Sequence, residues 1–371
     1  MRLGIDVREV RQGTSTGIAR YLCNFLDFVA QHPSGHELVL FGNQWTDWER
    51  LPSQFATRRL PERIRLVWDQ WIVARAARTE RVDLFYSPYH KGPYAVSCPL
   101  VVTVHDLYPF VLDTHRPRAL LERTQYRLML RRATAVIAVS QYVRQTLLER
   151  RVVDAARVHV VPNCVHPRFR PLDRTQSAHR VQGRFGIPAG YVLYVGSFLP
   201  YKNLSRLVEA YALLPQGLRR RHGLVFVGRE DRHAQLLRHG VQQRGLAADI
   251  RFLGITANEE LVDLYNAAGV VALISLKEGF GLPVVEGMAC GVPVMASTAT
   301  ALPEVAGEAG YLVDPRDPRA IAEALERVLT DEPLRQQMIA KGFQQVQRFR
   351  WETVELQRLR VLEQVAGADA A

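Results

Sequence analysis

The sequence predicts an α/β protein of two domains, each with a parallel sheet covered by helices. Its 371 residues are too many for one typical domain and suit two of about 150 to 200, each with its own core. Short apolar, β-branched runs alternate with helical segments, which is typical of βαβ units whose strands are buried on both faces. The clearest unit is 270–297, where strand 270–276 precedes a helix that begins near Pro283 and ends at Gly291, followed by strand 292–297.

Elements of the first half follow in the same alternation. A glycine-containing loop after the first strand opens a helix at Gly17, and Ser140 is a typical N-cap for the helix that follows it. The predicted strands are 2–7, 38–42, 64–68, 84–87, 99–104, 135–140 and 158–161. The predicted helices cover 17–30, 71–79, 116–132 and the segment after Ser140.

The second half repeats the pattern after a break. Residues 164–189 contain three prolines and two glycines among charged residues and show little periodicity, so we expect the interdomain linker there. Such a linker suits two lobes that close on substrates. The predicted strands are 191–195, 224–228, 250–253, 270–276 and 292–297, and the predicted helices are 204–213, 258–268, 283–291, 318–329, 333–348 and 351–365.

Composition excludes several classes of protein. Hydrophobic content of 47% and charged content of 23% are typical of globular domains, and no run of about 18 apolar residues is present. The first residues read as a strand without the apolar core of a secretion signal, so we expect a cytoplasmic protein. Neither CxxC spacing nor an Asp-x-Asp triplet occurs, so we expect reduced structural cysteines and no metal site.

Positive charge is concentrated in the first half. Residues 1–175 contain 26 Lys and Arg against 16 Asp and Glu, whereas residues 176–371 contain 22 against 21. An electropositive domain predicts an anionic partner, either nucleic acid, a lipid headgroup surface or a phosphorylated substrate. No aromatic-interleaved motif accompanies the charge, which disfavours nucleic acid. Segment 116–132, with six arginines among leucines, fits either an anionic membrane surface or a helix that packs its leucines on the sheet.

The loop between strand 270–276 and its helix combines glycines with two carboxylates. Two glycines allow a ligand to approach the main chain, and unpaired N–H groups at the helix start favour an anion such as phosphate. Glu278 precedes this loop, and Glu286, eight residues later, is expected in the first turn of the helix. Both carboxylates are therefore expected to border one cleft, one holding sugar hydroxyls and the other a ribose.

The string from Glu278 to Glu286, with Gly-Phe-Gly-Leu-Pro inside it, resembles the donor-site signature of the retaining glycosyltransferases of family 4. These are two-domain GT-B enzymes that use nucleotide-sugars. The resemblance covers nearly the whole chain and is strongest at 278–293. It implies two Rossmann-like domains facing across a cleft: residues 1–170, joined by a C-terminal helix 350–366 that crosses back, bind the acceptor, and residues 186–349 bind the nucleotide-sugar.

Two further segments match the same family. Thr103-Val104-His105-Asp106 resembles its Thr-x-His-Asp segment, which implies that His105 contacts the donor sugar and that Asp106 is an orienting or acceptor-side residue. Gly196 to Asn203 resembles its Gly-x-x-x-Pro-Arg-Lys-Asn segment, which implies that Lys202 neutralises the donor diphosphate. Tyr201 stands where the family usually has Arg, so one charge partner of the phosphate is missing.

The resemblance also suggests the remaining site residues. Gly17 lies where a family glycine contacts the donor diphosphate, although a plain turn glycine explains it equally well. Arg229 replaces the missing arginine only if the fold brings it close. The expected donor-binding set is Gly17, Ser197, Lys202, Arg229, Glu278, Gly279, Phe280, Gly281, Leu282 and Glu286, and the expected catalytic set is His105, Lys202 and Glu278.

The implied function is a retaining, metal-independent hexosyltransferase without a cofactor. The first-domain motif looks most like enzymes that move mannose or a related deoxyhexose from a GDP donor to a lipid-linked or polysaccharide acceptor in bacterial surface glycan synthesis, including lipopolysaccharide. A UDP-hexose donor, or a sugar-nucleotide enzyme of the same fold such as an epimerase, remains as an alternative. The expected location is the cytoplasm or the inner face of the membrane, without nucleic acid as partner.

Overall fold

The structure is a computed structural model that describes residues 1–13, 16–32, 35–64, 67–106 and 117–368, without the side chains of 117–122 and 368. The chain divides into two compact units. Unit 1 consists of Met1–Cys164 with Trp351–Ala371, and unit 2 consists of Val165–Arg350. This division places residues 165–170 and residue 350 in unit 2, whereas the sequence predicted 165–170 in the first domain and 350 in the helix that crosses back to it.

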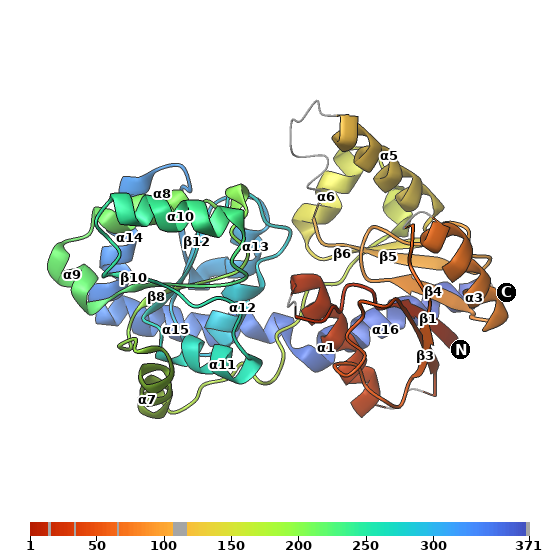
Figure 1. Ribbon diagram of the computed structural model, residues 1–371, viewed down its shortest axis with the longest axis horizontal. Coiled ribbons are helices and arrows are strands. Elements are labelled where there is room, and N and C mark those ends of the chain that lie inside the picture. Colours follow the sequence, from red (N-terminus) through yellow and green to blue (C-terminus); the bar gives the residue numbers. More distant parts are fainter. Residues whose placement is uncertain (14–15, 33–34, 65–66, 107–116, 369–371) are drawn as a thin grey trace. The chain divides into compact units, whose positions relative to one another are not determined.

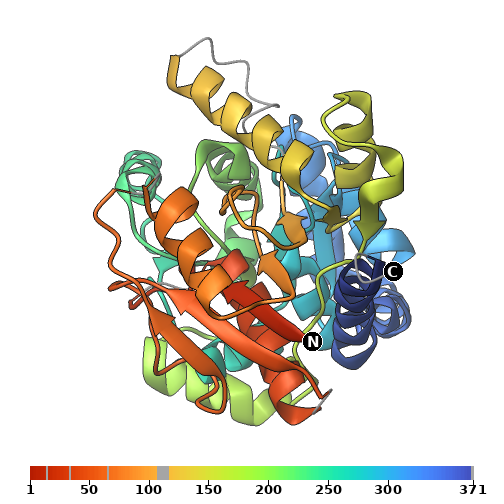
Figure 2. The same ribbon diagram turned by 90° about the vertical axis from the view of Figure 1, so that its right-hand side faces the viewer.

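Unit 1 is built on a seven-stranded sheet of order β3-β2-β1-β4-β5-β6-β7, in which every neighbouring pair is parallel (Figures 1 and 2). The strands β1, β4, β5 and β6 are almost wholly buried, which explains their near-continuous apolar sequences. The strands are β1 Arg2–Asp6, β2 Glu37–Gly42, β3 Ala56–Arg59, β4 Leu84–Ser87, β5 Leu100–Val104, β6 Ala135–Ala138 and β7 Val158–Val160.

Helices cover this sheet, and the C-terminal helix is one of them. Helix α16 contacts α1 and β4, and the Trp351 indole N–H donates to the Asn24 carbonyl at 2.9 Å. The C-terminal helix thus packs within unit 1. The helical segments are α1 Gly17–Gln31, the π-helical turn η1 Trp68–Ile72, α3 Val73–Thr79, α5 Pro117–Arg132, α6 Gln141–Glu149, η2 Ala155–Arg157 and α16 Trp351–Ala368.

Unit 2 contains a six-stranded parallel sheet of order β10-β9-β8-β11-β12-β13. Its strands are β8 Val192–Val195, β9 Leu224–Val227, β10 Ile250–Phe252, β11 Val270–Leu273, β12 Val294–Ser297 and β13 Gly310–Val313. Its helical segments are α7 Arg174–Phe185, η3 Pro200–Lys202, α8 Leu204–Ala212, α9 Gln216–Arg221, α10 Arg232–Gln243, α11 Asn258–Ala267, α12 Leu282–Ala289, α13 Leu302–Ala306, η4 Gly307–Ala309, α14 Pro318–Thr330, α15 Glu332–Val346 and η5 Gln347–Phe349. Two parallel-sheet, Rossmann-like units confirm the predicted fold class.

Two sequence predictions about elements were wrong. The third strand is β3, at Ala56–Arg59, and not 64–68, where the described residues lead into the π-helical turn η1. Strand β3 is at the edge of the sheet and mostly exposed, so it lacks the apolar signal of a buried strand. The predicted linker 164–189 contains helix α7, which packs on α11 with Arg180 and Ser177 bonded to the Asp263 carboxylate at 2.6 to 2.9 Å.

Helix α5 contains most of the arginine-rich segment 116–132. In its described side chains, Tyr126, Met129 and Leu130 are buried, and Arg132 donates to the carbonyls of Tyr94 and Val96. This part follows the alternative in which the helix packs its apolar residues on the domain. Residue 116 and the side chains of 117–122 lie outside the described residues.

Membrane-spanning helices, metal-binding clusters and disulfide bonds are absent from the residues that the structure describes. Within them, no helix is long and apolar enough to cross a membrane. The same part of the chain has no group of three or more His, Cys, Asp or Glu placed to bind a metal ion. No disulfide bond joins any of its four cysteines.

Candidate functional site

The loop between β11 and α12 has a backbone that requires glycine at one position. Gly281 has a φ of +105°, and a Cβ on it would lie 2.5 Å from the Leu302 Cδ2 atom. Helix α12 begins directly after it at Leu282, with Pro283 in its first turn. The N–H groups of a first helical turn lack intrahelical acceptors, so this glycine turn directs a donor-rich helix end out of the sheet.

A second loop, residues 196–203 after β8, is bonded to the first. The Asn203 side chain donates to the carbonyls of Ile274 at 3.1 Å and Pro315 at 2.7 Å, and its own backbone has a φ of +62°. The Leu276 N–H donates to the Tyr201 carbonyl at 2.8 Å. These bonds fix the two loops to each other at the carboxyl ends of the paired strands β8 and β11.

Tyr194, at the end of β8, supports the start of the second loop. Its hydroxyl donates to the Ser197 carbonyl at 2.7 Å, and a Cβ on Gly196 would meet that hydroxyl at 2.7 Å. Burial raises the pKa of the Tyr194 hydroxyl well above its ordinary value, and the nearby Glu278 carboxylate adds to the shift. The hydroxyl therefore stays protonated and remains a hydrogen-bond donor. Sequence reasoning missed this residue because a tyrosine in a strand gives no sign of its partner.

Lys202 and Glu278, one from each loop, form an ion pair. The Lys202 Nζ atom lies 2.6 Å from Glu278 Oε1, which also accepts from the Ser275 hydroxyl at 2.8 Å. The Glu278 N–H donates to Thr300 Oγ1 at 2.9 Å. The two side chains are 15% and 11% exposed, so both charges are largely desolvated yet reachable from solvent. The fold thus joins two residues that the sequence separates by 76 positions.

Glu286 lies deeper than the sequence predicts. It is the fifth residue of α12 and is 1% exposed, and its Oε2 atom accepts from the Tyr265 hydroxyl at 2.7 Å. Phe280 is buried as well, edge to face with Phe349 at 5.4 Å between ring centroids. The expected contacts of Glu286 with a ribose and of Phe280 with a donor stay predictions.

Arg229 follows Gly228 at the end of β9, beside the Ser197 turn. A Cβ on Gly228 would lie 1.9 Å from the Gly196 carbonyl oxygen, so the two turns touch. Ser197 and Arg229 are both exposed. Within the described ranges, the Arg229 guanidinium has no hydrogen-bond or ion-pair partner, which leaves it available for an anionic ligand. Its role as substitute for the missing family arginine stays a prediction.

His105, in unit 1, is held in one tautomer. Its Nε2 atom lies 2.8 Å from the Pro88 carbonyl oxygen, which only accepts, so Nε2 carries the proton. The pKa of His105 is lowered to about 4, mainly by burial and also by the charge of Arg358, whereas the hydrogen bond to the Pro88 carbonyl acts against the shift. The imidazole is therefore neutral at pH 7. Its Nδ1 atom has a lone pair without a donor among the described residues, and is suited to accept a hydrogen bond from a hydroxyl.

A buried cluster lies behind the imidazole. Tyr21 meets the His105 ring edge to face at 4.5 Å, and its hydroxyl lies 2.9 Å from Thr103 Oγ1. The Arg358 guanidinium lies 3.8 Å from the centre of the Tyr21 ring and is paired with Glu355, and both charged side chains are fully buried. No motif indicated Tyr21, Glu355 or Arg358, because their contact joins a first-domain helix to the C-terminal helix.

Gly17 and Asp106 occupy exposed positions in unit 1. Gly17 begins α1 behind the N-cap Thr16, and a Cβ on Gly17 would meet no atom of the described residues within 4 Å. Its φ is not positive, so neither conformation nor packing there demands glycine. Asp106 is exposed, and its carbonyl accepts from the Tyr126 hydroxyl at 2.7 Å. The rest of the predicted motif, residues 107–109, lies outside the described residues.

The candidate residues therefore form two sets. Gly17, His105 and Asp106 belong to unit 1, and the predicted residues 197, 202, 229, 278–282 and 286 belong to unit 2. Direct contact is present between Lys202 and Glu278. The predicted cleft that would bring the two sets to one ligand stays a prediction.

Comparison with known proteins gives a consistent result. Residues 15–169 match the family model described as Glycosyltransferase Family 4, and residues 178–345 match the one described as Glycosyl transferases group 1. The O-antigen chain mannosyltransferase B of Escherichia coli is 31% identical over 288 residues, which cover 77% of this chain and 75% of that protein.

Solved structures show the same fold. The sucrose-phosphate synthase of Thermosynechococcus elongatus has a TM-score of 0.82 at 23% identity, covering 99% of this chain and 100% of that one. Anabaena Alr3699/HepE, solved in complex with UDP and glucose, has a TM-score of 0.80 at 22% identity, covering 98% and 100%.

Proposed function

The chain belongs to family 4 of the glycosyltransferases, with the GT-B fold, and we propose that it transfers mannose or a related deoxyhexose from a GDP donor. The acceptor in this proposal is a lipid-linked or polysaccharide chain of the bacterial surface, built at the inner face of the cytoplasmic membrane. The 31% identity to an O-antigen chain mannosyltransferase supports both the sugar and the acceptor class. Transfer proceeds with retention of anomeric configuration and without a metal ion.

The observation that carries the proposal is the Lys202–Glu278 pair beside the N-terminus of α12. A nucleotide-sugar presents a diphosphate next to sugar hydroxyls, and this pair presents a cation next to a carboxylate. The Lys202 ammonium has three donors, so it can bond a phosphate oxygen while keeping Glu278. The carboxylate then accepts from hydroxyls of the transferred sugar, which fixes the sugar relative to the departing phosphate.

Catalysis of this reaction depends mainly on stabilising the leaving group. In front-face transfer, the leaving phosphate accepts the proton of the acceptor hydroxyl, and negative charge builds on the phosphate as the glycosidic bond breaks. A preorganised cation stabilises that charge more in the transition state than in the ground state. The N-terminus of α12 contributes about 0.3–1 kcal/mol in the same sense, and more where it is desolvated. Lys202 therefore acts on kcat.

His105 serves as a hydrogen-bond acceptor in this scheme. With a pKa of about 4 it is too weak a base to remove a hydroxyl proton at pH 7, and it is neutral there. Its Nδ1 atom instead accepts from a hydroxyl of the transferred sugar, while Nε2–H holds the ring on Pro88. Asp106, exposed beside it, faces the acceptor side in the proposal.

A second donor class has one specific observation in its favour. The HepE structure that shares this fold was solved with UDP and glucose, so a UDP-hexose is the alternative donor. An epimerase on the same scaffold would convert the sugar-nucleotide without an acceptor. We expect GDP to raise the melting temperature more than UDP or ADP, because ligands that bind the native state stabilise it by mass action.

Turnover distinguishes the candidates. Incubation with GDP-mannose, GDP-fucose and UDP-glucose, with and without a lipid-linked glycan acceptor, is followed by product analysis. Release of GDP and elongation of the acceptor support the proposal. Release of UDP alone would show that the donor is a UDP-hexose and not a GDP-sugar. Conversion of the sugar-nucleotide without elongation of the acceptor would show that the protein is an epimerase and not a transferase.

A further inference from the structure

One helical face of unit 1 is not explained by the transfer reaction. The backbone is helical through the π-helical turn η1 and on to the end of α3. A π-helical turn contains one residue more than an α-helical turn, and such turns are frequent at functional sites. Here it turns two consecutive residues, Trp68 and Asp69, towards the domain, while Trp71 points outward.

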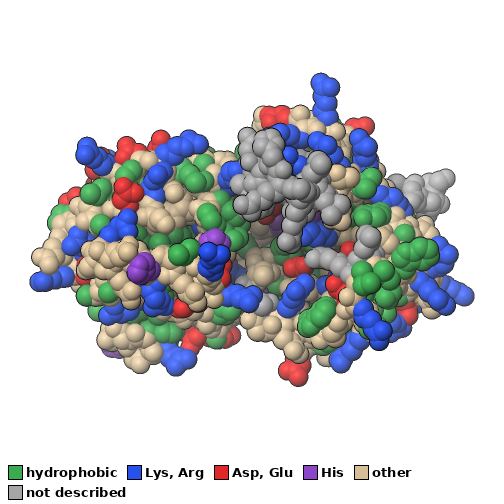
Figure 3. All heavy atoms as spheres, turned by 45° about the horizontal axis from the view of Figure 1, so that its top comes forward, with side chains coloured by type: hydrophobic (Ala, Val, Ile, Leu, Met, Phe, Trp, Pro, Cys, Tyr) green, Lys and Arg blue, Asp and Glu red, His purple; other side chains and the backbone are tan. Residues whose placement is uncertain are grey.

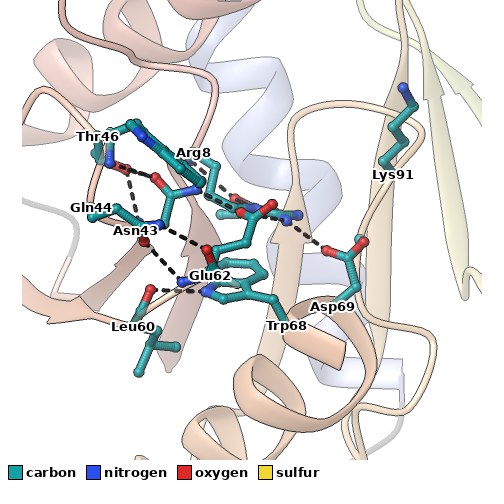
Figure 4. Close-up of polar contacts among 12 residues, drawn as sticks. Arg8, Asn43, Gln44, Thr46, Leu60, Glu62, Trp68, Asp69 and Lys91 are labelled. Carbon is teal, nitrogen blue, oxygen red and sulfur yellow. Dashed lines mark hydrogen bonds and ion pairs between the residues drawn. The ribbon is translucent and has the colours of Figure 1, made fainter. Parts of the chain in front are cut away.

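The inward side of this turn is fixed by a buried arginine (Figure 4). Arg8 lies with its guanidinium 3.8 Å from the centre of the Trp68 ring, and its Nη1 atom lies 2.7 Å from Asp69 Oδ1. The Trp68 indole N–H donates to the Leu60 carbonyl at 3.0 Å. Arg8 is itself held by Asp6, with Nη2 2.7 Å from Oδ2. These contacts fix the inward side of the helix to the domain, so its outward-facing residues are held in a defined position.

The outward side carries large apolar residues. Trp71 is 75% exposed, Ile64 is 64% exposed and Val67 is 43% exposed, and they follow one another at intervals of three and four residues. Arg75 and Arg78 continue the same spacing and are exposed. These five residues are called the Trp71 face below. From Val67 to Arg78 this face extends over about 16 Å at 1.5 Å per residue.

The charges of the Trp71 face select among partners. It contains two cations and no anion, and the guanidinium groups of Arg75 and Arg78 have no partner in the part of the chain that the structure describes. A second copy of the face would bring arginines near arginines. Figure 3 shows hydrophobic side chains beside Lys and Arg on the surface of unit 1. Apolar and aromatic residues next to arginines are suited to the headgroup region of an anionic bilayer, and the excess of basic residues in 1–175 acts in the same direction.

We propose that the Trp71 face is a membrane-docking surface for anionic phospholipids. Trp71, Ile64 and Val67 enter the interface between headgroups and acyl chains, and Arg75 and Arg78 bind lipid phosphates. This surface differs from helix α5, whose described apolar residues are mostly turned into the domain. The inference does not depend on the donor or the reaction, because vesicle binding requires neither.

The test is vesicle sedimentation of the full-length protein. Vesicles of phosphatidylcholine with 30 to 40 mol% phosphatidylglycerol, about that fraction being enough for a strong surface potential, are compared with pure phosphatidylcholine at low and high salt. Trp71→Ser is expected to weaken binding about tenfold, because the loss of one buried large side chain is worth roughly 1.5 kcal/mol or more. Arg75→Gln with Arg78→Gln is expected to weaken it more than tenfold at low salt and less at high salt, at about fivefold per charge.

Matched controls come from unit 2. Leu236→Ser removes an apolar side chain that is 60% exposed, and Arg220→Gln with Arg221→Gln removes two exposed charges. Both variants are expected to sediment like the wild type. Brominated lipids give an independent readout, since they are expected to quench tryptophan emission in the wild type and less in Trp71→Phe. Melting temperatures with and without GDP show whether each variant is folded and still binds nucleotide.

Several results would overturn the docking surface. Unchanged sedimentation of Trp71→Ser would do so, as would equal binding to neutral vesicles. Loss of binding in Leu128→Ser, with Trp71→Ser unaffected, would move docking to α5. A change of oligomeric state in Trp71→Ser without any vesicle binding would identify the face as a contact between copies of the chain. A failed nucleotide response alongside intact vesicle binding would count against the proposed donor only.

Discussion

Removal of the Lys202 charge should separate a catalytic from a structural role of the Lys202–Glu278 pair. Lys202→Met keeps the length of the aliphatic chain and deletes the ammonium that lies 2.6 Å from Glu278. Loss of a preorganised charge partner of a developing oxyanion typically costs a factor of 10² to 10³ in kcat, about 2.7–4 kcal/mol. We expect kcat/KM for the sugar donor to fall by about that factor, with the larger part of the loss in kcat.

The structure also gives the cost in stability. Breaking a fully buried ion pair costs about 3–5 kcal/mol, but these side chains are 15% and 11% exposed and Glu278 keeps its bond from Ser275. We therefore expect about 1–3 kcal/mol in Lys202→Met. Adding Glu278→Gln removes the unpaired carboxylate and should restore most of the stability, while activity stays low. Chemical denaturation and steady-state kinetics on the two single variants and the double variant measure both effects.

A surface pair of the same kind is the control. Lys341 lies 3.4 Å from Glu308, with side chains 39% and 90% exposed. Lys341→Met should change stability by less than about 1 kcal/mol and leave kcat/KM unchanged. The reasoning is refuted if Lys202→Met retains wild-type kcat/KM, or if the double variant recovers activity together with stability.

Three further outcomes follow from the geometry. Glu286→Gln, which keeps an acceptor for the Tyr265 hydroxyl, should raise the donor KM more than it lowers kcat, as measured by steady-state kinetics. His105→Gln should flatten the loss of stability on acidification: the folded-state pKa of about 4 lies below the ordinary 6.5, so the wild type loses roughly 1–3 kcal/mol as pH falls from about 6.5 to 4, measured by denaturation at several pH values. Gly281→Ala should cost about 1–3 kcal/mol and weaken nucleotide binding, because its φ is +105° and a Cβ has no room, whereas Gly217→Ala meets no atom and should not.

Each of these outcomes can fail in a recognisable way. If Glu286→Gln lowers kcat by as large a factor as it raises the donor KM, and also lowers the melting temperature, the carboxylate has a structural role in the core only. A pH dependence of stability identical to the wild type in His105→Gln would contradict a neutral buried imidazole. Tolerance of alanine at position 281 by calorimetry would show that the loop can adopt another backbone.

Buried strands were predictable from the sequence, and exposed or partner-dependent elements were not. Strands such as β11 and β12 are buried on both faces, so their apolar, β-branched sequences identify them. Strand β3 has the sequence Ala-Thr-Arg-Arg and is mostly exposed, so no apolar run distinguishes it from a loop. The apolar residues Ile64 and Val67 read as a strand instead, although in the structure both are exposed.

Helix α7 was missed for a related reason. It buries few of its side chains, among them Ser177 and Val181, so its periodicity is weak amid prolines and glycines. Its end signals were nevertheless present: Asp173 caps the first turn, and Gly186 ends the helix with a φ of +65°. End signals without an apolar stripe were insufficient to indicate a helix.

The candidate site was predictable in its residues and not in its contacts. The motifs named Lys202 and Glu278, but their ion pair depends on Asn203 and on the bond between Leu276 and Tyr201, which only the folded chain reveals. Spacing along the helix gave the position of Glu286 in α12 but not its burial, because Tyr265 comes from another helix. Contacts between distant segments follow from topology, and a single sequence contains little information about them.

The most direct measurement of the donor site is a crystal structure of the protein with GDP-mannose or its non-hydrolysable analogue. We predict that the diphosphate lies within hydrogen-bond distance of Lys202 Nζ and the N–H groups at the start of α12, and that hydroxyls of the sugar bond to Glu278. A donor bound elsewhere in the protein, with the Lys202–Glu278 pair untouched, would contradict the assignment.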